Sequence, residues 1–137
     1  MLRFRQLSGL YVVVRLAPDA DAPGWANVGW ASFGLANRGA EKGFVSITRT
    51  EDELSVVCPL ENVPKELISG PRWICLKLQG PFPFSQTGVL LSFIEPLSRN
   101  GIPIFAVSTY DTDYVLVPEE FAEAALAVLQ SAGHERI

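Results

Sequence analysis

The feature that most constrains the fold of this chain is a similarity between its two halves. When the sequence is shifted by 62 positions, residues 11–16 (YVVVRL) align with residues 73–78 (WICLKL), another apolar run. A shift of 60 positions places Ile47 on Val107 and Glu53 on Asp113. A sequence that matches itself at two nearly equal shifts indicates a duplicated supersecondary unit.

Each half shows the element order of a βαββαβ unit. Runs rich in β-branched and aromatic residues predict strands at residues 10–16, 44–50, 54–58, 73–79, 102–109 and 113–117. Helical spacing of apolar residues predicts helices over residues 87–100 and 118–133, with a final edge strand at 134–137. One or two helical turns are expected at residues 64–68, and a short helix with an irregular loop at residues 19–43.

The two long helices are expected to bury one face each. In the first, Leu90, Ile94 and Leu97 have the spacing of a single apolar face, and Pro96 predicts a bend. The apolar positions of the last helix are Phe121, Ala124, Ala125, Val128 and Leu129. The expected fold class is therefore α+β, with tandem ferredoxin-like modules whose helices cover one face of antiparallel sheets. The expected domains are residues 1–70 and 71–137.

Composition argues against several classes of function. The net charge is −4 and the eleven Lys and Arg residues are scattered, so no basic surface for a nucleic acid is expected. The apolar run at residues 10–14 is interrupted by Arg15 and is too short for a signal peptide or a membrane span, which favours a soluble cytoplasmic protein. Cys58 and Cys75 lie in apolar runs and are expected to be buried free thiols.

The chain lacks the residues that common catalytic sites require. Its one histidine, His134, lies near the C-terminal end and is expected to be solvated. Two distant cysteines do not form a zinc site, and the glycines lack the spacing of a phosphate-binding loop. We therefore expect no metal, no cofactor and no enzymatic activity.

Two segments carry polar residues suited to a small ligand. Residues 82–90 (FPFSQTGVL) join a strand to the start of a helix, and residues 108–114 (STYDTDY) form the tip of a hairpin. A helix that begins at Thr87 and Gly88 presents free N–H groups and the positive end of its dipole, which suit a carboxylate. Gly88 allows a ligand to approach the backbone closely, and the hydroxyls of Ser85 and Thr87 add donors.

The hairpin supplies the opposite charge. Asp111 or Asp113 can hold an α-ammonium group or a cationic side chain. An alternative is purely structural: Ser85 or Thr87 caps the helix, and the two aspartates stabilise the turn. The residues expected to contact a ligand are Ser85, Gln86, Thr87, Gly88, Val89, Thr109, Tyr110, Asp111 and Asp113.

Together with residues 44–49 (FVSITR) and 53–58 (ELSVVC), these segments resemble the ACT-domain proteins that carry two intertwined modules. The chain is similar to the ACT modules that regulate aspartate kinase and to the CASTOR arginine sensors of animal cells. The likeness runs from about residue 10 to Gly133 and is strongest over residues 80–118. Gln86 departs from the pattern, because an apolar residue is more usual there, and the loop at residues 26–43 is long.

This resemblance implies a regulatory sensor that binds an amino acid at the interface between its modules. Its expected partners are the amino acid and either a second copy of the chain or a regulated protein, with no nucleic acid and no membrane. The alternative is a structural or interaction protein that assembles through its sheet face or edge without a ligand.

Overall fold

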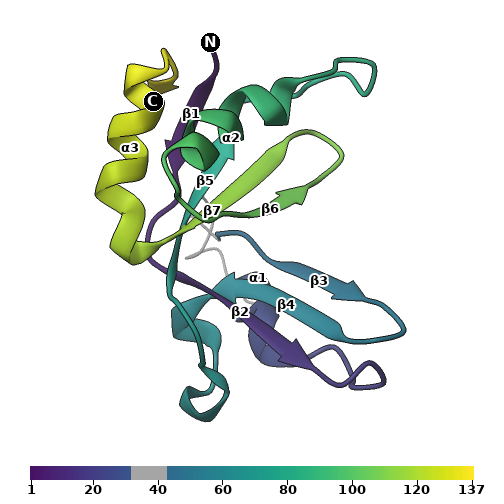
Figure 1. Cartoon of the computed structure of the whole chain (residues 1–137). Coiled ribbons are helices and arrows are strands. Elements are labelled where there is room, and N and C mark those ends of the chain that lie inside the picture. Colours follow the sequence, from purple (N-terminus) through teal and green to yellow (C-terminus); the bar gives the residue numbers. More distant parts are fainter. Residues whose placement is uncertain (32–42) are drawn as a thin grey trace. The chain divides into compact units, whose positions relative to one another are not determined.

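The computed structural model describes residues 1–31 and 43–137, which fall into two compact units (Figure 1). The middle unit is Ser8–Arg72, and the terminal unit joins Met1–Leu7 to Trp73–Ile137. The first seven residues therefore lie with the second half of the sequence. The domain division expected after residue 70 stays a prediction.

The middle unit contains an antiparallel sheet in the order β3–β4–β2. Its elements are β2 (Tyr11–Leu16), η1 (Gly24–Asn27), α1 (Val28–Ala31), β3 (Ser46–Arg49), β4 (Leu54–Pro59), η3 (Leu60–Asn62) and η4 (Lys65–Leu67). Alternate residues of β2 and β4 form the core, which Ala26 of η1 completes. The short helix expected within residues 19–43 corresponds to η1 and α1, whereas residues 32–42 of the expected loop lie outside the described residues.

The terminal unit contains a sheet in the order β6–β7–β5–β1–β8. Its strands are β1 (Arg3–Gln6), β5 (Trp73–Leu78), β6 (Phe105–Ser108), β7 (Asp113–Pro118) and β8 (Glu135–Arg136). From β5 onward the elements follow the predicted order βαββαβ, which confirms the α+β, ferredoxin-like fold class. The strand β1 inserts between β5 and β8, antiparallel to β5 and parallel to β8.

The terminal unit also contains the helices α2 (Val89–Arg99) and α3 (Ala122–Ser131), and the short η5 (Glu119–Phe121) leads into α3. The buried face of α2 is formed by Val89, Phe93 and Leu97. The prediction was correct for Leu97 and wrong for Leu90 and Ile94, which are only half-buried. The difference arises from β1, because its buried Phe4 contacts Phe93 edge to face, with ring centroids 5.3 Å apart.

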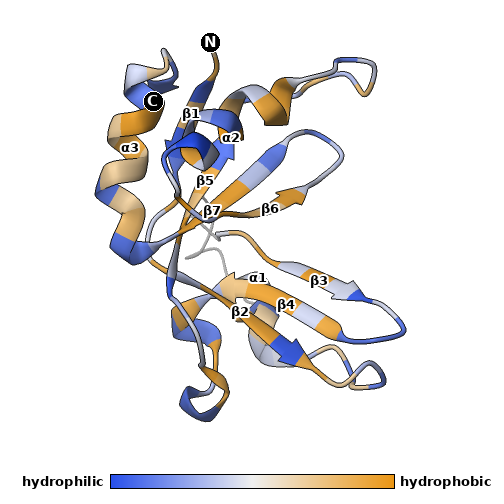
Figure 2. Ribbon diagram, in the orientation of Figure 1, coloured by the Kyte–Doolittle hydropathy of each residue, from blue (hydrophilic) through white to orange (hydrophobic). Residues whose placement is uncertain are grey.

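The helix α3 buries a narrower stripe than predicted. Ala125 and Leu129 are fully buried, Phe121 and Val128 are half-buried, and Ala124 is exposed. Hydrophobic residues run along β2, β4 and β7, while the turn between β3 and β4 is hydrophilic (Figure 2). The alternation of the strands thus places apolar side chains in the cores of both units.

His134 is buried, with 7% of its surface exposed, and the expectation that it is solvated was wrong. Its Nδ1 accepts a hydrogen bond from the N–H of Leu2 at 3.1 Å, so the ring proton lies on Nε2, which donates to the carbonyl oxygen of Ser92 at 3.0 Å. In a regular helix that carbonyl would accept from residue 96, but Pro96 has no N–H. His134 therefore satisfies the backbone group that the proline leaves open.

Cys58 and Cys75 are free and buried, as predicted. Burial raises the pKa of the Cys58 thiol to about 11 and that of Cys75 to about 12, because a thiolate loses hydration there. Both side chains are therefore neutral at physiological pH. Among the described residues, no helix is long and apolar enough to span a membrane.

Candidate functional site

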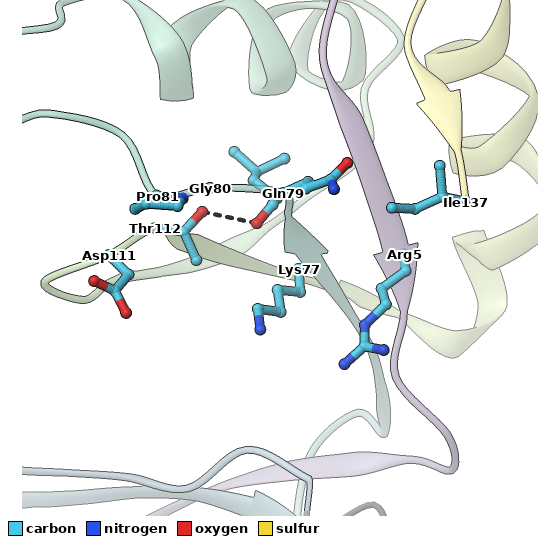
Figure 3. Close-up of a pocket in the computed structure, with 9 residues that line it drawn as sticks. Arg5, Lys77, Gln79, Gly80, Pro81, Asp111, Thr112 and Ile137 are labelled. Atoms are coloured by element: carbon cyan, nitrogen blue, oxygen red, sulfur yellow. Dashed lines mark hydrogen bonds between the residues drawn. The ribbon is translucent and has the colours of Figure 1, made fainter.

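A pocket of about 320 Å³ lies in the terminal unit where β1, the end of β5 and the β6–β7 turn meet (Figure 3). The polar side chains that line it are those of Arg5, Lys77, Gln79, Asp111 and Thr112. A larger hollow of about 630 Å³ lies over α2 and α3, but its carboxylate and guanidinium, from Glu95 and Arg99, already form an ion pair at 2.6 Å. Unlike that hollow, the smaller pocket presents basic and acidic groups that are not engaged with each other among the described residues.

The wall of the pocket joins the two segments that the sequence singled out. The N–H of Phe82 donates to the carbonyl of Asp111 at 2.9 Å, and the hydroxyl of Thr112 donates to the carbonyl of Leu78 at 2.8 Å. At Gly80, a β-carbon would lie only 2.8 Å from the carbonyl oxygen of Asp111. The close approach of the loop and the turn therefore requires glycine at this position.

The turn itself is held by its own side chains. The hydroxyl of Thr109 donates to the carbonyl of Thr112 at 2.9 Å, and the carboxylate of Asp113 accepts a hydrogen bond from the Ser108 hydroxyl. Asp113 thus stabilises the turn, as the structural alternative expected, although its partner is a side-chain hydroxyl and not the backbone. Asp111 differs, because its carboxylate is exposed and lines the pocket.

No described side chain caps the start of α2. Gly88 is the N-cap, with a left-handed φ of 76°, and neither Ser85 nor Thr87 caps the helix. A β-carbon at Gly88 would meet no described atom within 4 Å, so the backbone conformation, rather than crowding, favours glycine here. Ser85, Gln86 and Thr87 are exposed, whereas Val89 faces the core.

The loop and the turn also meet through two exposed aromatic rings. Phe84 and Tyr110 pack edge to face with centroids 4.8 Å apart, although 76% and 80% of their surfaces remain exposed. Of the residues expected to contact a ligand, Asp111 alone lines the pocket, and Tyr110 contacts the adjoining loop. A ligand contact by the other predicted residues stays a prediction.

Two basic residues of the pocket, Arg5 and Lys77, were not among the residues that the sequence pointed to. Arg5 and Lys77 are directly paired across β1 and β5, and Figure 3 shows their side chains extending to the same side. The strand alternation already placed Lys77 on the polar face of residues 73–79, which is the one signal the sequence offered. The sequence offered no such signal for Arg5, since no strand was expected at the N-terminus.

Next to this pair lies the half-buried phenol of Tyr114. The Nζ of Lys77 is 5.9 Å from the ring centroid of Tyr114, within reach of a cation–π contact. Burial is the largest cause that raises the pKa of Tyr114; the Cys75 thiol, once ionised, and the carboxylate of Asp111 raise it further, while the positive charge of Arg5 opposes the shift. Tyr114 is therefore a neutral group beside two cations.

The arrangement can bind a small molecule that carries both charges. The basic groups on the strands can pair with an anion, and the carboxylate of Asp111 on the turn can pair with a cation. Within the described parts of the chain, no cluster of three or more His, Cys, Asp or Glu residues could hold a metal ion. The pocket thus suits the recognition of charged groups.

Comparison with known proteins places this unit in a family. A model of the ACT domain matches residues 68–131, and a second model, for an N-terminal domain, matches residues 39–66. A cytosolic arginine sensor for mTORC1, subunit 1, from Bos taurus is 26% identical over 113 residues, which cover 79% of this chain. The chain spans 31% of the length of that relative.

Solved structures show a similar fold. Protein Atu0741 from Agrobacterium tumefaciens is 43% identical, with a TM-score of 0.82 over 99% of this chain and 92% of that one. The regulatory subunit of aspartate kinase from Thermus thermophilus shares the fold, with a TM-score of 0.56 and 19% identity over 97% of this chain and 96% of that one. Residues 68–131 of this chain therefore form an ACT domain.

Proposed function

We propose that this chain is a regulatory module that binds a small amino acid beside the loop between β5 and α2. The observation that carries the proposal is the pocket in which this loop and the β6–β7 turn meet, closed by the Phe82–Asp111 hydrogen bond and by the required glycine at Gly80. Its volume of about 320 Å³ lies within the range of small-molecule sites. The arginine-sensor name of one relative and the regulatory-subunit name of another agree with such a role.

In this proposal the ammonium group of the ligand pairs with the exposed carboxylate of Asp111. Its α-carboxylate takes N–H donors at the start of α2, where the first helical bond runs from Ser92 to Gly88 and no described side chain caps the helix. The exposed hydroxyls of Ser85 and Thr87 add donors to the same group. Binding, and not turnover, is the proposed activity, and the cytosol is its proposed place of action.

Thermal unfolding with a panel of the twenty amino acids tests this function. A ligand that binds only the folded state stabilises it by RT ln(1 + [L]/Kd), about 2.7 kcal/mol at a hundredfold excess over Kd. We expect one chemically related group of amino acids to raise the melting temperature while the others leave it unchanged. A flat response to all of them at millimolar concentration would show that the module does not bind a free amino acid.

A second candidate function is assembly through a sheet edge. Within the described chain, β6 pairs with β7 alone in the terminal unit, and Ala106 and Ser108 on it are exposed. Such a strand offers its other side to a partner strand. Light scattering over a range of protein concentrations tests this: a stable dimer that Ala106→Pro dissolves would favour assembly, and a monomer at all concentrations would rule it out.

A further inference from the structure

The single histidine of the chain connects the first strand to a helix of the terminal unit. The buried ring of His134 accepts the N–H of Leu2 at Nδ1 over 3.1 Å. Its Nε2 donates to the carbonyl oxygen of Ser92 on α2 over 3.0 Å, and its ring packs against Phe93 with centroids 5.3 Å apart. One side chain therefore links the start of β1 to α2.

Only the neutral form of this ring can make both hydrogen bonds. A neutral imidazole has one donor nitrogen and one acceptor nitrogen, whereas a protonated imidazole has two donors. Protonation of His134 would place an N–H opposite the N–H of Leu2, so the bond between them would be lost, while the bond to Ser92 would remain. The protonated form would also hold a positive charge that is largely removed from water.

The charged groups around the ring do not offset this cost. From the elements packed around it, they are Glu95 and Arg99 of α2, Glu135 and Arg136 of β8, and, at the start of the chain, Arg3 and the α-amino group of Met1. The two carboxylates already form ion pairs, at 2.6 Å between Glu95 and Arg99 and at 3.6 Å between Glu135 and Arg3. The residues of α3 that line the hollows beside the ring are uncharged. Each carboxylate near the ring is thus engaged with another cation.

The bond to Leu2 continues a row of hydrogen bonds between β1 and the end of the chain. The N–H of Glu135 donates to the carbonyl of Leu2 at 2.8 Å, and the N–H of Ile137 donates to that of Phe4 at 2.7 Å. Arg5 of β1 and Ile137 both line the pocket described above (Figure 3). This wall of the pocket therefore depends on the pairing of β1 with residues 135–137.

We propose that His134 is an acid-sensitive latch, whose protonation loosens the pairing of β1 with β8 and with it the wall of the pocket formed by Arg5 and Ile137. The docked strand holds the neutral ring, so the opened form takes up more protons and gains population as the pH falls. An exposed imidazole is half protonated near about pH 6.5, which places the change between about pH 7 and about pH 5.5. This inference goes beyond the proposed function, because it requires no ligand.

The size of the effect is set by one proton. A single titrating group changes an opening equilibrium by at most about tenfold per pH unit. Phe4 is buried and packs on Phe93, and protonation of the histidine leaves that contact in place. The strand therefore opens more often at acidic pH and remains docked for most of the time.

Hydrogen exchange, corrected for the intrinsic pH dependence of amide exchange, tests the latch at the amides of Glu135 and Ile137, whose acceptors lie on β1. We expect their protection to fall about fivefold or more between about pH 7 and about pH 5.5. His134→Asn keeps an acceptor oxygen near the position of Nδ1 and does not titrate, so its protection should change by less than about twofold. The amides of β2 and β4 in the middle unit are the internal control and should keep their protection.

Other titrating groups do not obscure the result, because ordinary carboxyl and α-amino groups titrate near about pH 4 and about pH 8. Constant protection of Glu135 and Ile137 across the range would overturn the inference, as would an equal loss in His134→Asn. If His134→Asn does not fold, the ring ¹⁵N shifts of the natural chain replace it, since they report the one histidine alone. The loss of protection should then accompany proton uptake by the ring, and a loss that is complete while the ring is neutral would refute the latch.

Discussion

Two aspartates on one turn face different surroundings. The carboxylate of Asp113 accepts a hydrogen bond from Ser108, whereas that of Asp111 is exposed at the pocket. We predict that Asp111→Asn weakens amino-acid binding by about 1.5–3 kcal/mol, because it removes a charged partner of the ammonium group.

Asp113→Asn makes the matched control on the same turn. It should leave the affinity nearly unchanged and lower the free energy of unfolding by about 1 kcal/mol, since it weakens one hydrogen bond of the turn. Calorimetric titration and urea unfolding of both variants measure the two quantities. Equal losses of affinity would show that the pocket does not distinguish the two carboxylates.

At the same scale, the buried thiols predict a pH dependence of stability. The pKa of Cys75 is raised to about 12 from a reference value of 9.0, so the folded state keeps its proton where the unfolded state loses it. The unfolded state therefore binds fewer protons above pH 9, and the free energy of unfolding falls as the pH rises from there toward 12. Below pH 9 the contribution of the Cys75 thiol to stability is fully present.

Replacing Cys75 isolates the contribution of its thiol to the pH dependence of the free energy of unfolding. We expect Cys75→Ala to lose less stability than the natural chain between pH 8 and about pH 10.5 in urea unfolding, since the alanine has no proton to lose. Tyr114 also titrates at alkaline pH and is present in both proteins. The quantity to compare is therefore the slope of the free energy of unfolding against pH in the two proteins. Parallel slopes would mean that the thiol ionises freely in the folded protein.

At the scale of elements, His134 and Pro96 form a coupled pair. The imidazole binds the carbonyl of Ser92 and the N–H of Leu2. His134→Ala leaves both backbone groups without these partners, and we predict a loss of about 2–3 kcal/mol in the free energy of unfolding.

The proline provides an internal test of this reasoning. In a Pro96→Ala protein the new N–H of residue 96 can bond to the Ser92 carbonyl, so removing His134 should be about 1 kcal/mol less damaging there. Urea unfolding of the four proteins in the cycle measures this coupling. An identical effect of His134→Ala in both backgrounds would show that the histidine does not replace the missing helical bond.

At the scale of the whole molecule, the first seven residues complete a sheet whose other strands begin at Trp73. Phe4 is 1% exposed and packs on Phe93 of α2. We predict that Phe4→Ala lowers the free energy of unfolding by about 3–5 kcal/mol, because it opens a cavity between β1 and the helix. Phe84→Ala, at a ring that is 76% exposed, is the matched control and should change stability by less than about 1 kcal/mol. Similar effects in urea unfolding would mean that β1 is not part of the stable core.

The sequence determined much of this architecture by itself. The match between the two halves and the alternation within residues 73–78 were enough to predict the βαββαβ order, because both depend on local periodicity. Burial of the two cysteines followed from the apolar runs around them.

Only the tertiary structure decided the features that join residues far apart in the chain. The pairing of Arg5 with Lys77, the contact of Phe4 with Phe93 and the burial of His134 all depend on where β1 enters the sheet. A strand of four residues with alternating polarity carries no signal that names its neighbours. Register between segments about seventy residues apart is set by packing and hydrogen bonds that form only when the sheet does, which is why the basic side of the pocket emerged with the fold.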